Sequence, residues 1–109
     1  MSRELDERVA VEVMGWKRVA DKFQDPHDNC LWGKVNSYST DIGQAWLVVE
    51  EMRKRGYGCA IFYHWEVSET NPSCEFDWRD TNGNLHAIEE SGGTVPEAIC
   101  RAALEATND

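Results

Sequence analysis

Hydrophobic residues recur with the period of an α-helix in three segments of the chain, residues 2–14, 39–56 and 95–106. The apolar positions are Leu5, Val9 and Val13 in the first segment, Ile42, Ala45, Trp46, Val49 and Met52 in the second, and Val95, Ile99, Ala102, Ala103 and Ala106 in the third. Each set lies on one face of its helix. Each predicted helix therefore has a side that other parts of the chain must cover.

Polar residues at the predicted helix starts are suited to capping. Ser39 can accept a hydrogen bond from the first turn and act as the N-cap of the second helix, and Asp41 then faces the positive end of the helix dipole. Ser39 is a poor candidate for a nucleophile, because a nucleophile needs a base within reach and no histidine is near in the sequence. Thr94 and Glu97 form a capping box that predicts the start of the third helix.

Period-two patterns predict β-strands between the second and third helices. Residues 59–67 are rich in β-branched and aromatic residues, and one face carries Ile61, Tyr63, Trp65 and Val67. The next strand alternates, with Cys74, Phe76 and Trp78 on the inner face and Glu75, Asp77 and Arg79 on the outer face. Asn82-Gly83 predicts a two-residue hairpin turn, which would pair Trp78 with Ala87 and Arg79 with His86.

Residues 17–37 follow neither period. The turn-forming QDPHDN separates two short pieces that can be strands or ordered loop. Trp16 and Trp32 flank this segment, which ends at Tyr38. The three aromatics can form a small cluster that fastens a long loop, or a surface that stacks on a base or anchors a partner.

The order of these elements predicts an α+β fold in a single domain, residues 1–109. An N-terminal helix precedes a helix, a three-stranded antiparallel meander and a final helix, which together would form a layered helix and sheet sandwich. This order resembles the double-stranded-RNA-binding domain. That family places lysines at the start of its last helix, whereas residues 94–97 here are Thr-Val-Pro-Glu, so the order indicates fold and not function.

Three stretches carry a closer resemblance. LDERVAVEVMGW near the start, YSTDIGQAWLVVEEM in the middle and PEAICRAALEA near the end resemble the phage ABA sandwich domain family. The resemblance implies a phage protein, helix–sheet–helix layering and action in the cytoplasm of a bacterial host. The charged face of residues 75–79 predicts instead that one side of the sheet is solvated, unless the first helix covers part of it.

The net charge of −9 argues against binding of a nucleic acid duplex, because phosphate contacts need clustered lysines or arginines. The only basic cluster, residues 53–55, lies at a predicted helix C-terminus, where the dipole repels phosphate. No apolar run is long enough to predict a membrane span. We expect a cytosolic protein with four reduced cysteines, Cys30, Cys59, Cys74 and Cys100.

Neither a metal site nor a catalytic motif is indicated. His27 and Cys30 form one closely spaced pair of possible zinc ligands, whereas a structural zinc site usually takes two such pairs. No phosphate-binding loop, nucleophile elbow or dinucleotide-binding glycine pattern occurs, so no cofactor or enzymatic activity is predicted.

The sequence thus favours a phage accessory protein that acts by binding. Its ligand would be a host protein or a nucleotide-derived signal of an antiphage defence, with a homo-oligomer also possible. The alternatives are a small enzyme acting on a nucleotide-like molecule and an inert structural or assembly component. The candidate binding residues are Trp16, Trp32 and Tyr38 around the irregular segment, with Arg79 and His86 on the hairpin.

Overall fold

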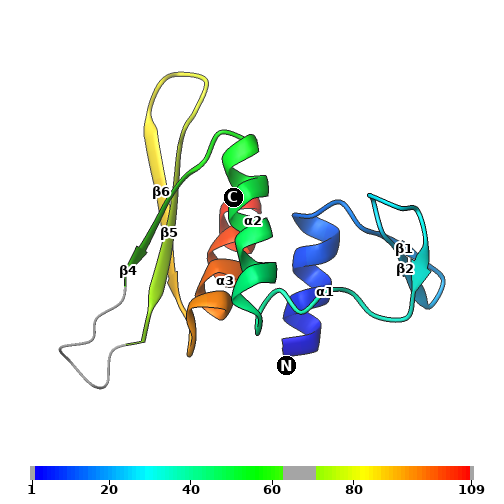
Figure 1. The fold of residues 1–109 in the computed structure, drawn as a ribbon. Coiled ribbons are helices and arrows are strands. Elements are labelled where there is room, and N and C mark those ends of the chain that lie inside the picture. The colour runs from blue at the N-terminus through cyan, green and yellow to red at the C-terminus, as the bar shows by residue number, and fades with distance from the viewer. Residues whose placement is uncertain (1, 63–70, 109) are drawn as a thin grey trace.

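A computed structural model describes residues 2–62 and 71–108 (Figure 1). The elements in chain order are α1 (Ser2–Glu12), β1 (Lys17–Val19), β2 (Lys22–Gln24), β3 (Leu31–Trp32), α2 (Ile42–Lys54), β4 (Gly58–Phe62), β5 (Ser73–Arg79), β6 (Leu85–Ser91) and α3 (Val95–Thr107). The prediction of an α+β fold with a helix, an antiparallel meander and a helix after the first helix is confirmed. The predicted strand end, including Tyr63, Trp65 and Val67, lies outside the described residues.

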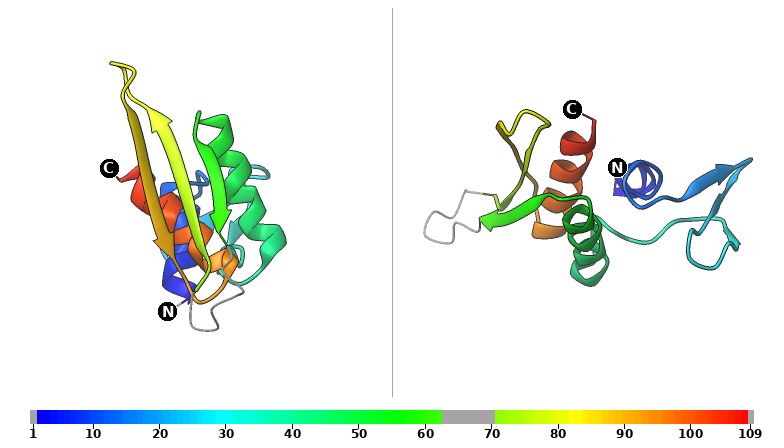
Figure 2. Two further views of the ribbon diagram at one scale, coloured as in Figure 1. Left: turned by 90° about the vertical axis from the view of Figure 1, so that its left-hand side faces the viewer. Right: turned by 90° about the horizontal axis from the view of Figure 1, so that it is seen from above.

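The larger sheet has the strand order β4-β5-β6, and all of its pairs are antiparallel. α2 and α3 lie side by side on one face of this sheet, and α1 packs against α3 on the side away from the sheet (Figures 1 and 2). α3 is therefore the central element, which explains its small side chains. Ala98, Ala102, Ala103 and Ala106 are all buried and allow close approach of its neighbours.

The opposite face of the sheet carries the charged residues Glu75, Asp77 and Glu89. Register places Glu75 opposite Ala60 and Glu89, so these side chains share one face, away from the buried Cys74 and Phe76. α1 packs against α3 on the other side of the molecule, so of the two alternatives the first helix does not cover the charged face (Figure 2). All helices in the described part of the chain lie on one side of the larger sheet.

Residues 17–32 form a second, small antiparallel sheet with the order β1-β2-β3, which settles the ambiguous segment in favour of strands. Ala20 adopts a positive φ of 57° in the turn between β1 and β2, and Asn29 one of 59° before β3. Phe23 is the buried side chain of this sheet. The small sheet sits at the far side of α1 from α3 (Figure 2).

The N-cap of α2 is Asp41, and not Ser39 as predicted. Asp41 Oδ1 accepts the backbone N–H groups of Gly43 at 2.8 Å and Gln44 at 3.1 Å. Ser39 is buried, and its own N–H donates to Asp6 Oδ1 at 2.7 Å. The predicted cap at Ser39 is therefore wrong, because Ser39 is bound to Asp6 of α1 two positions before the actual N-cap, Asp41.

Asp41→Ala is expected to lower the free energy of unfolding by about 0.5–2 kcal/mol, since two N–H groups of the first turn lose their acceptor. Thr40→Ala is the matched control, because Thr40 is exposed and has no part in the cap. Urea titration of both variants measures the difference. Equal midpoints for Asp41→Ala and the wild type would contradict the assignment of the cap.

The buried face of α2 is also rotated from the predicted one. Ala45, Val49 and Met52 are buried as expected. Ile42 is 55% exposed and Trp46 49% exposed, and Val48 is buried in their place. The sequence contains two overlapping apolar stripes on this helix, and contact with α3 selects the stripe that includes Val48.

The hairpin between β5 and β6 has a longer loop than predicted. Trp78 pairs with His86 and Arg79 with Leu85, so the register differs by one residue from the two-residue turn. The N–H of Asp80 donates to Asn84 O at 3.0 Å, and Gly83 has a positive φ of 83°. A three-residue loop with glycine in the left-handed region gives this register. It places Ile88 opposite Phe76 on the helix-covered face.

The start of α3 agrees with the predicted capping box. Thr94 Oγ1 accepts the N–H of Glu97 at 3.4 Å, and Glu97 Oε1 accepts the N–H of Gly93 at 3.1 Å. None of the helices among the described residues combines the length and apolar composition needed to cross a bilayer.

Candidate ligand-binding pocket

α1, the end of β3 and the loop after it line an open pocket of about 660 Å³, which we call the Trp32 pocket. Its lining residues are Arg3, Asp6 and Glu7 from α1, and Trp32, Gly33, Lys34, Val35 and Ser37 from the opposite wall. The volume is within the range of small-molecule sites, about 300–1,000 Å³. The pocket is thus large enough for a molecule of nucleotide size.

Trp32 is the largest apolar side chain that lines this pocket. It pairs with Phe23 across β2 and β3, so both rings lie on the same face of the small sheet. Phe23 is buried and fixes the sheet, whereas the Trp32 side chain is 49% exposed. A half-exposed indole on a hydrogen-bonded strand is a rigid surface on which a planar ring can stack.

The charged side chains of the Trp32 pocket differ in whether they are free to bind a ligand. Arg3 Nε is 3.2 Å from Glu7 Oε2, so these two side chains form an ion pair along α1. Asp6 is buried and accepts the Ser39 N–H, which ties α1 to the segment before α2. Lys34 is exposed and makes no hydrogen bond or ion pair with any residue that the structure describes. Its ammonium group is available to an anionic ligand.

A further cation lies next to this pocket. A smaller hollow shares Arg3, Glu7 and Gly33 with the Trp32 pocket and extends to Arg18 and Phe23. The Arg18 guanidinium carbon lies 5.3 Å from the centroid of the Phe23 ring, a cation–π arrangement. The surface between α1 and the small sheet therefore combines aromatic rings with basic groups.

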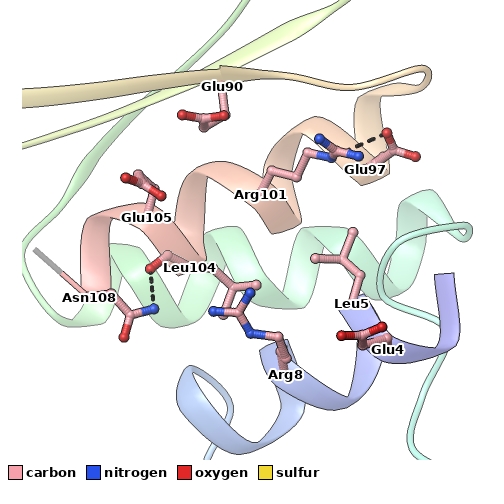
Figure 3. A pocket seen from close by; sticks show the side chains of 9 residues that line it. All are labelled: Glu4, Leu5, Arg8, Glu90, Glu97, Arg101, Leu104, Glu105 and Asn108. Atoms are coloured by element: carbon pink, nitrogen blue, oxygen red, sulfur yellow. Dashed lines mark hydrogen bonds and ion pairs between the residues drawn. The ribbon is translucent and has the colours of Figure 1, made fainter. Parts of the chain in front are cut away.

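A second pocket, of about 350 Å³, lies between α1 and α3 beside β6 (Figure 3). It is lined by four carboxylates, Glu4, Glu90, Glu97 and Glu105, and by two arginines, Arg8 and Arg101. Both arginines are already paired, Arg101 with Glu97 at 3.3 Å and Arg8 with Glu12 at 3.1 Å. This excess of negative charge disfavours an anionic ligand there.

The structure places Trp16 and Tyr38 together in the interior. Trp16 Nε1 donates to the Tyr38 hydroxyl at 3.0 Å, and both side chains are buried. Burial raises the pKa of Tyr38 above its ordinary value. The pair therefore supports the interpretation of an aromatic cluster that fastens residues 17–37 to the helices, and it leaves little ring surface for a ligand.

Arg79 and His86 lie at the loop end of the β5–β6 hairpin, remote in the fold from the Trp32 pocket (Figure 1). Arg79 donates to Gly83 O at 2.9 Å, and the His86 ring stacks on Trp78 with centroids 5.5 Å apart. His86 Nε2 lies 2.8 Å from Asp80, and this hydrogen bond, with those from backbone N–H groups, lowers the pKa of Asp80. These contacts stabilise the hairpin loop.

The cysteines contribute no group to the Trp32 pocket. Cys74 and Cys100 are buried, and burial raises the pKa of the Cys100 thiol to about 12. The hydrogen bond shared with Cys59, at an Sγ–Sγ distance of 3.9 Å, raises the pKa of Cys74. In the described part of the chain, no three histidine, cysteine or carboxylate side chains are placed to hold a metal ion.

Sequence reasoning singled out Trp32 but did not include Arg3 or Lys34. Arg3 lies in the predicted first helix and Lys34 in the segment 17–37, which follows neither period. The signal that could have found Lys34 is its place two residues after Trp32, because an aromatic and a cation close together on a loop suit a nucleotide.

Helices packed on one face of an antiparallel meander, with a pocket outside the core, define a small layered α+β domain. The chain belongs to the phage ABA sandwich domain family, whose profile matches residues 7–104, as its sequence resemblance predicted. A crystal structure of a phage protein from Bacillus cereus ATCC 14579 has a similar fold, with a TM-score of 0.69 and 20% identity. The match covers 100% of this chain and 89% of that one, and at this identity it concerns the fold alone. No curated protein matches the chain.

Proposed function

We propose that this protein is a phage accessory protein that binds and sequesters a small nucleotide-like molecule, such as a defence signal, in the host cytoplasm. The ligand would combine a planar base with at least one phosphate. The base would stack on Trp32, and the phosphate would pair with Lys34. Binding without turnover is sufficient for this role, because a bound signal cannot reach its host receptor.

The observation that carries this proposal is the combination of Trp32 and Lys34 on one wall of a 660 Å³ pocket. Stacking on an aromatic side chain contributes about 1–3 kcal/mol per base, and it tolerates any base because every base has a π-face. The free ammonium of Lys34 adds a point charge for phosphate. The Trp32 pocket also carries equal numbers of basic and acidic lining residues, whereas the α1–α3 pocket carries more acidic ones.

An enzymatic role in this pocket has less support. Asp6 and Glu7 are its carboxylates, and a general base needs a carboxylate free to approach the reacting proton. Asp6 is buried in its hydrogen bond to the Ser39 N–H, and Glu7 is paired with Arg3. These contacts suit the two carboxylates to structural roles.

Trp32→Ala is expected to weaken binding of a nucleoside monophosphate by about 1–3 kcal/mol, because the stacking surface is lost. Isothermal titration calorimetry with AMP, GMP, CMP and UMP measures the dissociation constants. Leu31→Ala is the matched control, because Leu31 is half-exposed on the same strand but does not line the pocket. Binding by none of the four nucleotides, or equal affinities of Trp32→Ala and the wild type, would contradict the proposed function.

A second pair of variants separates the contribution of the phosphate to binding from that of the base. Lys34→Ala should weaken AMP binding and leave binding of neutral adenosine unchanged, because only the phosphate uses the ammonium group. Lys22→Ala removes an equal charge from an exposed residue that lines none of the described pockets. An equal loss in both lysine variants would indicate a general effect of net charge and would count against a phosphate site at Lys34.

We expect no binding of a 20-base-pair RNA or DNA duplex tighter than roughly 10⁻⁶ M at physiological salt. The basic cluster of residues 53–55 is largely neutralised, since Arg53 pairs with Glu50 at 3.0 Å and Arg55 with Glu51 at 3.1 Å. A fluorescence anisotropy titration provides the measurement. Tighter binding of either duplex would favour a nucleic-acid-binding role over small-ligand sequestration.

A further inference from the structure

β4 is an edge strand of the larger sheet without the features that usually prevent edge pairing. Proteins protect such edges with charged side chains, proline or bulges. Gly58–Phe62 has the sequence GCAIF, so it contains no charge and no proline, and its pairing with β5 is regular over all five residues. Four of these five residues are exposed. The opposite edge strand, β6, differs because it carries His86, Glu89 and Glu90.

The adjacent flank of α2 is apolar as well. Arg55 Nη2 donates to Val13 O beyond the end of α1, and Leu47 and Glu51 line a hollow with Trp16, so this flank of α2 faces the α1 side. Ile42 and Trp46 lie on the opposite flank of the same helix, and both are about half-exposed. The edge of β4 and the body of α2 face the viewer together in Figure 1. The two elements thus present one apolar surface on the helix side of the sheet, made by Ile42, Trp46, Cys59 and Ile61. Phe62 lies on the other face of β4.

The side chains of β4 are complementary to those of a second copy of the same strand. In an antiparallel pair centred on Ala60, Gly58 of each copy would face Phe62 of the other, and Cys59 would face Ile61. Every large side chain is then opposite a small one. An isologous interface needs this self-complementarity, because residue i of one copy contacts residue j of the other, and residue j of the first copy contacts residue i of the second.

The charge of the chain also favours a second copy of β4 as the partner of this edge strand. The chain carries a net charge of −9, so two copies repel each other wherever acidic surfaces meet. Pairing through β6 would place Glu89 and Glu90 of each copy in the interface, whereas pairing through β4 brings together five uncharged residues from each copy. We propose that β4 and the Ile42–Trp46 flank of α2 form a two-fold dimer interface that joins two three-stranded sheets into one six-stranded antiparallel sheet.

This dimer leaves the Trp32 pockets open, because the small sheet lies on the far side of the helices from β4 (Figure 2). Each dimer therefore presents two separate pockets. The inference does not depend on the ligand of the pocket, since it rests on β4, the Ile42–Trp46 flank of α2 and the charge of the two edge strands.

Sedimentation velocity at micromolar concentrations tests the proposal. The wild type is expected to sediment as a species of twice the 12.4 kDa chain mass. Ile61→Lys should raise the dimer dissociation constant by at least about a hundredfold, because each dimer would bury two like charges at its interface. Trp46→Ser should weaken the dimer independently, through lost apolar contact on α2. Leu85→Lys is the control, since it adds the same charge to an exposed apolar residue of β6 and should leave the dimer intact.

Circular dichroism would verify that each variant is folded. A monomeric wild type, or a dimer that persists in both Ile61→Lys and Trp46→Ser, would overturn the proposal.

Discussion

Replacing Phe76 by alanine is expected to lower the free energy of unfolding by about 3–5 kcal/mol, the largest loss of any substitution considered for this chain. Phe76 is in the central strand β5, is fully buried, and faces the helices between Cys59 and Ile88. Its ring also makes an edge-to-face contact with Tyr57, with centroids 6.4 Å apart. The deletion leaves a cavity that α3 cannot fill without moving off the sheet.

Urea unfolding at one fixed protein concentration measures this loss as a lower midpoint with an unchanged slope. Leu85→Ala is the control, because Leu85 is an apolar residue of the same sheet that is 61% exposed. Its substitution should change the stability by no more than about 0.5 kcal/mol. A loss below about 1.5 kcal/mol in Phe76→Ala would mean that Phe76 is not at the centre of the core.

Gly92→Ala is expected to be the second most damaging change, with a loss at or above the upper end of the usual overpacking range, about 3 kcal/mol. A Cβ atom at Gly92 would lie 2.7 Å from the backbone nitrogen of Ala98 and 3.0 Å from the backbone carbon of Glu97. Neither atom belongs to a flexible side chain, so the start of α3 would have to move. The N–H of Gly92 also donates to Pro72 O at 3.1 Å, which restricts any shift of the loop.

The adjacent glycine provides an internal control for this prediction. A Cβ atom at Gly93 would meet no atom within 4 Å. Gly93→Ala is therefore expected to be neutral, or to stabilise by about 0.4–1 kcal/mol through the reduced entropy of the unfolded chain. Thermal unfolding of the two variants should give a large decrease in Tm for Gly92→Ala alone. Equal values of Tm would contradict the close approach of this loop to α3.

The three helices were predictable because their apolar residues repeat over two to three turns, and the capping box predicted the start of α3. Val9 and Val13 are buried as predicted, and Gly15 after α1 has a positive φ of 85°. The hairpin register was not predictable in the same way. Asn82-Gly83 fits both a two-residue and a three-residue loop, and only the pairing of Ile88 with Phe76 against the helices decides between them.

The candidate site was predictable only in part. Five tryptophans gave several aromatic candidates, and their burial depends on tertiary contacts that sequence periodicity does not contain. Trp46 was expected in the core and is half-exposed, whereas Trp16, expected beside a loop, is buried against Tyr38. The Trp32 pocket brings Arg3 and Lys34 together from distant parts of the chain, and this proximity exists only once the small sheet lies beside α1.

Mass spectrometry of the protein purified under native conditions from phage-infected bacteria tests the central claim, the sequestration of a nucleotide-like ligand, most directly. The wild type should carry a phosphate-bearing, ultraviolet-absorbing small molecule that heat denaturation releases unchanged. Trp32→Ala should be isolated without this molecule, and Leu31→Ala should retain it. A wild-type protein that shows only its bare mass, or a host protein bound equally by the wild type and Trp32→Ala, would contradict the account.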